Sequence, residues 1–206
     1  ILISVCDKEY NIDLYNKVIE NGIPMVFFDR TVEKVKASQV RMDDYIMAFF
    51  MVEALLRKGY KHIIHIPGPA YIRNSYERLS GYRDALEKFH VEYQPQDVLS
   101  PALSAEEGSW VMKQYLQQNV PFDAVFGFTE TAVLGAKSEI QKQGLRIPND
   151  VALCCMSGTA LATLVHPQLT AVEQPIGKMA QESCRLLMEH ITDSNKKTEE
   201  IALRGE

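Results

Sequence analysis

The chain has 206 residues, 46% of them apolar, which is enough for one large domain or for two smaller units with packed cores. Its formal net charge of −5 argues against nucleic-acid binding by this segment alone, because binding to phosphates requires clustered Lys and Arg side chains. Its apolar stretches are shorter than the roughly 20 residues that a bilayer-spanning helix needs.

Short apolar runs alternate with longer stretches of helical period, from the first residues, ILISVC, to the end of the chain. This alternation is typical of parallel strands joined by crossover helices. Helices are therefore predicted between the strands, and the fold class is predicted to be α/β with parallel sheets flanked by helices. The predicted strands span residues 2–6, 25–29, 39–42, 62–66, 98–100, 124–128, 151–156, 169–173 and 200–203.

Three of the predicted helices carry boundary or core signals. The helix over residues 44–58 starts behind Asp43 or Asp44 and stops at Gly59, whose missing Cβ suits a left-handed conformation. Ser104 and Glu107 form a capping-box pattern at the start of another helix. In the last long helix, the apolar residues that recur with helical period are predicted to face the core: Ile176, Met179, Ala180, Leu187, Met188 and Ile191.

Polar side chains follow directly after most of the predicted strands. In an open parallel sheet, ligands bind beyond the carboxyl ends of the strands, because several loops converge there. Arg and carboxylate side chains hold two hydrogen bonds at fixed angles, which suits the hydroxyls of a sugar or the edge of a purine. The candidate binding residues at these positions are Asp29, Arg30, Tyr71, Asn74, Arg78, Thr129, Glu130, Ser157 and Gln174.

A structural explanation competes with ligand binding at several of these positions. Thr129 and Ser157 are well placed to cap the helices that follow them. Asp29 and Arg30 are adjacent and can pair with each other or with their own loop. The residues by themselves leave both interpretations open.

The sequence contains no motif that predicts catalysis, a cofactor or a metal site. It has no G-x-S-x-G elbow, no Walker-type loop and no G-x-G-x-x-G. His62 and His65 are predicted to point to opposite faces of a strand, and the other three histidines are far apart in sequence. The four cysteines lack metal-ligand spacing and are predicted to be buried thiols in a reducing cytosol. We therefore expect a cytoplasmic protein that is not an enzyme.

Motifs dispersed over almost the whole length resemble the effector-binding core of the LacI/GalR family of bacterial transcription regulators. The order and spacing of these motifs carry the resemblance more than any single one of them. They are GIPMVFFDR (22–30), RMDDYIMAFFMVEALLRKGYKHIIHIPGP (41–69), RLSGYRDAL (78–86), GFTETAVLGA (127–136), QGLRIPNDVAL (143–153) and HPQLTAVEQP (166–175).

The resemblance implies roles for several of the candidate binding residues. Arg78 stands at the family's effector-contacting Arg, and Glu130 takes the place of the effector-binding Asp, one methylene longer. Thr129 replaces the usual Asn, and Ser157 stands where a carboxylate is common. By position, Leu103 replaces an aromatic wall of the pocket. These departures imply that the ligand differs from the family's commonest one.

The resemblance also implies a two-lobed, periplasmic-binding-protein-like (type I) fold. It places residues 1–41 and 159–173 in a first, N-terminal lobe and residues 42–158 and 174–206 in a second lobe. Family members have a helix-turn-helix domain, a hinge helix and the opening elements of the first lobe before the position of Ile1. We therefore expect an incomplete first lobe, a homodimer, and operator DNA binding only through the missing N-terminal domain.

The functional hypothesis is the effector-binding core of a LacI-type regulator that senses a small polar, sugar-like metabolite without a cofactor. The ligand is expected to bridge Arg78 and Glu130 with Asp29 or Arg30. The alternative is a periplasmic sugar-binding protein of a transport system, which an upstream signal peptide would indicate. A third alternative, an enzyme of the open α/β class, is disfavoured because the sequence shows no nucleophile motif or phosphate loop.

Overall fold

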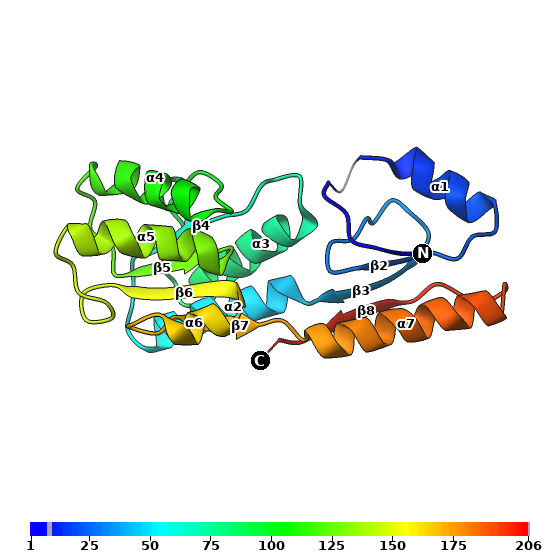
Figure 1. The fold of residues 1–206 in the computed structure, drawn as a ribbon. Coiled ribbons are helices and arrows are strands. Elements are labelled where there is room, and N and C mark those ends of the chain that lie inside the picture. Colours follow the sequence, from blue (N-terminus) through cyan, green and yellow to red (C-terminus); the bar gives the residue numbers. More distant parts are fainter. Residues whose placement is uncertain (8–9, 206) are drawn as a thin grey trace. The chain divides into compact units, whose positions relative to one another are not determined.

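The computed structural model describes residues 1–7 and 10–205, and the chain divides into two compact units. The first unit comprises Ile1–Asp43, Tyr71–Arg73 and Gln174–Glu206, and the second comprises Asp44–Ala70 and Asn74–Glu173. Each unit has its own four-stranded parallel sheet (Figure 1). The fold is therefore α/β with parallel sheets flanked by helices, as predicted.

The sheet of the first unit has the strand order β1-β2-β3-β8, with parallel neighbours throughout. Tyr15 packs edge-on against Phe27 at 5.4 Å between ring centroids, and this pair anchors a small core with Val5, Met25 and Val32. The elements of this unit are β1 (Leu2–Ile3), α1 (Ile12–Glu20), β2 (Val26–Phe28), β3 (Ser38–Met42), α7 (Ile176–Thr192) and β8 (Glu200–Leu203).

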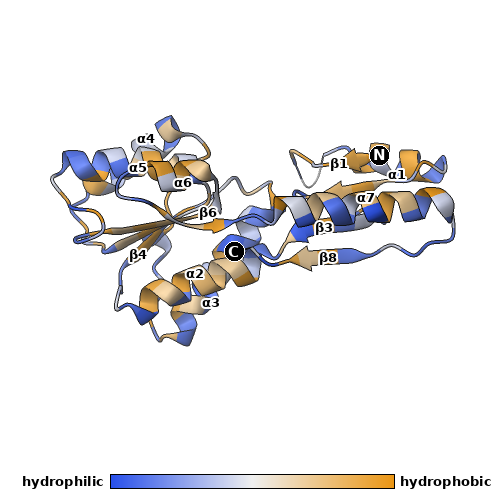
Figure 2. Cartoon of the chain, turned by 60° about the horizontal axis from the view of Figure 1, so that its bottom comes forward, coloured by the Kyte–Doolittle hydropathy of each residue, from blue (hydrophilic) through white to orange (hydrophobic). Residues whose placement is uncertain are grey.

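The sheet of the second unit has the order β4-β5-β6-β7 and is also parallel. Helices α2 and α3 lie on one side of this sheet, and α4 and α5 lie on the other (Figure 2). The bounds are α2 (Asp44–Arg57), β4 (Ile63–Ile66), α3 (Arg73–Lys88), η1 (Pro95–Asp97), α4 (Ala105–Leu116), β5 (Ala124–Gly127), α5 (Glu130–Lys142), β6 (Ala152–Gly158), α6 (Ala160–Leu164) and β7 (Thr170–Glu173).

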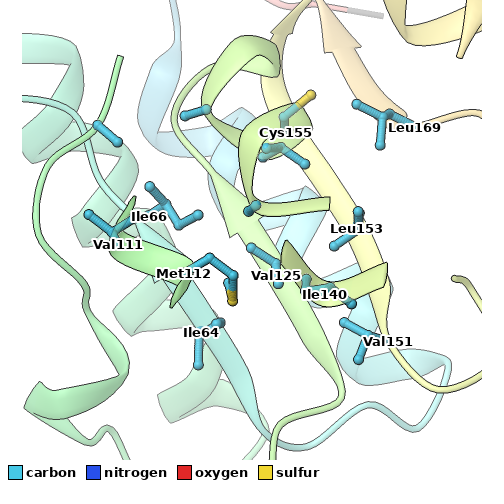
Figure 3. Close-up of a cluster of buried hydrophobic side chains, with 14 of the residues drawn as sticks. Ile64, Ile66, Val111, Met112, Val125, Ile140, Val151, Leu153, Cys155 and Leu169 are labelled. Carbon is cyan, nitrogen blue, oxygen red and sulfur yellow. The ribbon is translucent and has the colours of Figure 1, made fainter. Parts of the chain in front are cut away.

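The core of the second unit is built on register-paired strand residues. Ile64, Val125 and Leu153 are neighbours across β4, β5 and β6, and all three are buried. Met112 from α4 and Ile140 from α5 pack into the same cluster (Figure 3). Apolar runs in central parallel strands are therefore explained by burial of the sheet on both faces.

One predicted strand is wrong, and so is the assignment of two segments to their units. The described backbone of residues 98–100 forms no strand beyond a single parallel bridge from Val98 to His65. Residues 159–173 belong to the second unit because β7 pairs with β6, and residues 174–206 belong to the first unit because β8 pairs with β3. The pairing of β-strands in space decides the division, and this information is not local in sequence.

The buried face of α7 also differs from the prediction. Met179 is buried as expected, but its buried neighbours are Ser183 and Leu186, at helical offsets of 4 and 7. The side chains of Ile176, Met188 and Ile191 are at least 57% exposed. The helical period was predicted correctly, whereas the face that meets the sheet was not.

Cys154 and Cys155 are buried in β6 as predicted, whereas Cys6 and Cys184 are exposed. All four cysteines lie among the described residues and are free thiols. Within the described part of the chain, no helix combines the length and the apolar character needed to cross a membrane.

Two glycines allow α4 and α5 to pack at very short range. A Cβ added at Gly108 would overlap the carbonyl oxygen of Ala132 and lie 2.7 Å from its carbonyl carbon. A Cβ added at Gly135 would overlap the carbonyl oxygen of Ala105 in the same way. Each helix thus presents a glycine to the backbone of the other, so a side chain at either site would push the helices apart.

Gly108→Ala is expected to destabilise the second unit by about 2–3 kcal/mol, because overpacking against backbone atoms cannot be relieved by a rotamer change. Urea unfolding followed by circular dichroism measures this free energy. Gly177→Ala is the matched control, since this helical glycine has nothing within 4 Å of an added Cβ. The control should be neutral or stabilising by up to about 1 kcal/mol. Equal effects in both variants would contradict the packing argument.

His65 lies at the centre of an aromatic stack in the second unit. Its ring is fully buried between Phe126, at 4.8 Å, and Tyr82, at 5.4 Å between centroids. Its Nδ1–H donates to the Phe126 carbonyl at 2.9 Å, and its Nε2 has no hydrogen-bond partner among the described residues. Burial lowers the pKa of His65 from 6.5 to about 4, and the charges of Arg78 and Arg83 act in the same direction.

The second unit is expected to lose stability as the pH falls from about 6.5 to about 4, because the unfolded chain protonates His65 in this window and the folded chain does not. A pKa difference of this size corresponds to roughly 3 kcal/mol. Urea unfolding at a series of pH values measures it. His65→Asn should flatten the slope between pH 4 and 6.5, whereas the exposed control His90→Asn should keep it. Identical slopes in all three proteins would refute the assignment.

Candidate functional site

Six of the predicted binding residues gather in the second unit at the carboxyl ends of its strands. Arg78 and Asn74 come from α3, Thr129 and Glu130 from the junction of β5 and α5, and Ser157 from the end of β6. Leu103 lies just before α4. The Thr129 hydroxyl donates a hydrogen bond to the Leu103 carbonyl at 3.3 Å. The rule that ligand-binding residues follow parallel strands therefore brings together residues up to 83 positions apart.

Arg78 is the most deeply buried member of this group, with 1% of its surface exposed. Its Nε and Nη2 both lie 2.6 Å from Asp44 Oδ1. Its Nη1 donates to the Phe128 carbonyl at 2.5 Å, and its Nη2 donates to Ser157 Oγ at 3.1 Å. The guanidinium also lies over the Phe128 ring, 4.2 Å from its centroid. The guanidinium of Arg78 is thus occupied by Asp44 and by protein groups at the ends of β5 and β6.

Glu130 is 3% exposed and opens α5. Its Oε2 accepts a hydrogen bond from Thr159 Oγ1 at 2.6 Å, and its Oε1 accepts a long one from Thr159 N at 3.4 Å. Burial raises the pKa of the Cys155 thiol to about 12, with the Glu130 charge adding to the rise and the Arg78 charge opposing it. Both charges therefore act on the same end of β6, and Glu130 retains acceptor capacity beyond its two bonds to Thr159.

The backbone at the end of β6 is unusual at Ser157. Its φ of 57° is in the left-handed region, which is uncommon for a residue other than glycine. The pairing of β6 with β7 shifts register between Cys155 and Gly158. Such irregularities change the direction in which a side chain leaves the strand. Here the irregularity presents the Ser157 hydroxyl to Arg78.

The capping explanation holds for one of the two residues to which it was applied. Thr129 is the N-cap of α5, since its hydroxyl accepts from Ala132 N at 3.2 Å. The cap of α6 is Thr159 and not Ser157, because Leu161 N donates to Thr159 Oγ1 at 3.2 Å. The predicted capping box of Ser104 and Glu107 is present at the start of α4.

The remaining four predicted residues lie in the first unit. Asp29 and Gln174 line one hollow of about 290 Å³, whose other walls are mainly apolar side chains, including Leu2 and Phe28. Tyr71 is 48% exposed, and the Arg30 carbonyl accepts from Val5 N at 3.1 Å. Asp29 and Gln174 are thus brought together, at the carboxyl end of β2 and directly after β7.

Three residues that the sequence argument missed take part in the second unit's site. The sequence predicts Asp44 only as a possible helix cap, yet it is the counter-ion of Arg78. Phe128 contributes its carbonyl and its ring to Arg78, and Thr159 binds Glu130. The pair Asp43-Asp44 before an apolar helix was the one available signal, and it does not distinguish a cap from an ion-pair partner.

The geometry suits hydrogen bonding to a ligand. Among the residues that the structure describes, no group of three or more His, Cys, Asp or Glu side chains could hold a metal ion. Buried polar groups at the carboxyl ends of parallel strands are typical of ligand-binding domains of the open α/β class.

Residues 52–205 match the family model of the periplasmic binding protein-like domain, and the chain belongs to this family. The HTH-type transcriptional repressor CytR of Escherichia coli K12 is 30% identical over 168 residues, which are 82% of this chain and 49% of that protein. The HTH-type transcriptional regulator CelR of Thermobifida fusca is 31% identical over 84% of this chain and 52% of its own length. The chain spans about half the length of these curated relatives.

Solved structures show the same fold. A CelR–cellobiose complex aligns with all of this chain and 63% of its own, with a TM-score of 0.91 and 27% identity. A LacI family regulator from Enterococcus faecium with bound ribose aligns with all of this chain and 75% of its own, with a TM-score of 0.87 and 22% identity. The resemblance to LacI-type regulators and the periplasmic-binding-protein-like fold class are thereby confirmed.

Arg78→Gln is expected to destabilise the second unit by about 3–5 kcal/mol, because it leaves the buried Asp44 carboxylate without its counter-ion. Urea unfolding measures the loss. Arg146→Gln is the control, since Arg146 makes a comparable two-point contact with Asp150 but is 71% exposed. The control should change stability far less, because solvent screens exposed pairs. A similar loss in both variants would show that burial of the Arg78 pair is not the cause.

Proposed function

We propose that this chain is the effector-binding part of a LacI-type transcription regulator and that it senses a small, neutral, hydroxyl-rich metabolite. The observation that carries the proposal is the position of Thr129, Glu130 and Ser157 at the ends of β5 and β6, the ends that the buried Arg78 joins through Phe128 and Ser157. Family membership supports it, and so do the regulator names of the relatives.

The side chains divide into groups that hold the site and groups that are available to a ligand. Arg78 spends its fork on Asp44, Phe128 and Ser157, so its main contribution is to fix the ends of β5 and β6. Glu130 has neutral Thr159 as its described partner and can accept further hydrogen bonds from ligand hydroxyls. Neutral sugars suit this arrangement, since a carboxylate next to a ligand hydroxyl forms a charge-assisted bond. The relatives with solved complexes contain cellobiose and ribose.

Control of DNA binding belongs to the proposal for the whole protein. The relatives are HTH-type regulators, and this chain spans about half of their length. We propose that effector binding here alters operator binding by a helix-turn-helix domain in a cytoplasmic homodimer, because a ligand shifts an equilibrium by its differential affinity for two states. The regulator names favour this function over sugar transport and over catalysis.

The proposal is tested by isothermal titration calorimetry with cellobiose, ribose, other neutral sugars and nucleosides. Glu130→Gln keeps the shape of the side chain but removes its charge, so binding should weaken roughly 10- to 100-fold if a charge-assisted hydrogen bond is lost. Ser157→Ala should weaken binding less, because a neutral hydroxyl is lost.

The control for these titrations is Glu139→Gln, the same change on the same helix but bonded to Ser109 and Lys142. It should bind like the wild type. If the wild type binds no member of the panel, the neutral-metabolite proposal is wrong. If a ligand binds and Glu130→Gln leaves its affinity unchanged, the site lies elsewhere.

A further inference from the structure

Asp44 occupies a special place in the chain path of the second unit. It is the first residue of that unit after the chain leaves the first unit at Asp43, and it is also the first residue of α2. Its side chain is 1% exposed. One carboxylate oxygen, Oδ1, receives Arg78, and the other, Oδ2, receives Asn74 Nδ2 at 2.7 Å. Both oxygens of a buried carboxylate are thus engaged by named partners.

Asn74 occupies the equivalent place at a second crossing. The chain returns to the second unit between Arg73 and Asn74, so Asn74 is again the first residue after a crossing. Its side chain is 5% exposed and lies in the first turn of α3. The hydrogen bond from Asn74 to Asp44 therefore joins two points, 30 residues apart, at which the chain enters this unit.

Arg78 extends this connection to the proposed binding edge. From Asp44 the bonds continue through its guanidinium to the Phe128 carbonyl and to the Ser157 hydroxyl. We use the name Asp44 network for the five residues Asn74, Asp44, Arg78, Phe128 and Ser157. All five belong to the second unit, so the network runs within one compact body.

We propose that Asp44 is a positioning residue that couples the two points at which the chain enters the second unit to the effector-binding edge, an inference that rests on the proposed function. The physical reason is the cost of separating a buried ion pair. A guanidinium without its counter-ion in a buried site is strongly unfavourable, so Arg78 and Asp44 move together or not at all. A ligand that shifts Ser157 or the loop after β5 therefore acts on the chain crossings through Arg78 and Asp44.

Linkage makes the coupling reciprocal. If occupation of the binding edge changes the conformational preference of the crossings, a perturbation at the crossings must change ligand affinity by the same factor. Connection through contacts does not by itself establish coupling, so a measurement at a distance from the altered residue is needed. Asn74 and Ser157 are suitable ends for this measurement because Asp44 and Arg78 lie between them in the Asp44 network.

The test uses hydrogen exchange of the ligand-free protein with two matched variants in the first turn of α3. Asn74→Ala removes the bond to Asp44, and Ser75→Ala removes a buried bond to the Gly68 carbonyl, 2.6 Å long, that lies outside the Asp44 network. Exchange at residues 156–159 and 128–131 is compared with exchange at the core residue Val125, which reports global opening. We expect Asn74→Ala to accelerate exchange in both of these segments at least tenfold relative to Val125. We expect Ser75→Ala to change exchange there less than threefold.

Equal exchange at residues 156–159 in the two variants would overturn the proposal. A second variant, Asp44→Asn, keeps the side-chain shape and removes the charge; it is expected to give the same acceleration more strongly. If Asp44→Asn does not fold, the Asn74→Ala and Ser75→Ala pair still decides.

A titration adds an independent arm, with whichever sugar of the calorimetric panel binds the wild type. Asn74→Ala should lose at least tenfold in affinity, and Ser75→Ala should stay within threefold. Unchanged affinity in Asn74→Ala would contradict the coupling even if exchange changes. If the wild type binds no sugar of the panel, the proposed function fails, and the exchange result alone decides on the Asp44 network.

Discussion

The buried ion pair of Arg78 and Asp44 is the interaction on which the second unit's binding edge depends. Both residues are 1% exposed, so neither charge is stabilised by water and each requires the other. The geometry that satisfies them also holds the carbonyl of Phe128 and the hydroxyl of Ser157. One electrostatic requirement therefore fixes the relative positions of α2, α3, β5 and β6. Ser157, whose backbone is left-handed, is one of the groups held in this way.

Glu130 stands in contrast to Asp44, although both are buried carboxylates at the start of a helix. Asp44 is matched by a positive charge and an amide, and its role is to hold other groups in place. Glu130 accepts two hydrogen bonds from the neutral Thr159 and keeps further acceptor capacity, which we propose serves ligand hydroxyls. In the proposed function, the charge of Asp44 is neutralised within the protein, whereas the charge of Glu130 is available to a ligand.

Both units follow the same rule of construction, although their sheets differ in composition. In each, polar residues stand where parallel strands end, and in the first unit this rule brings Asp29 and Gln174 to a common hollow. The hollow in the first unit is lined mainly by apolar side chains, whereas the edge of the second unit presents polar side chains. In the second unit, close packing through Gly108 and Gly135 fixes α4 against α5, and α5 begins at the polar edge. Close packing matters here because recognition by hydrogen bonds depends on fixed angles.

The sequence by itself determined the features that are local: the apolar strands, the capping box of Ser104 and Glu107, and the cap of α5 at Thr129. It also predicted most polar residues of the candidate site, because a position after a strand can be recognised without knowing the strand's neighbours. Only the tertiary structure decided that residues 159–173 belong to the second unit and residues 174–206 to the first. It also decided that α7 buries Ser183 and Leu186 and that Asp44 is the partner of Arg78. These features depend on which distant strands and helices become neighbours, and pairing in space follows from the packing of the whole chain, which no short stretch of residues encodes.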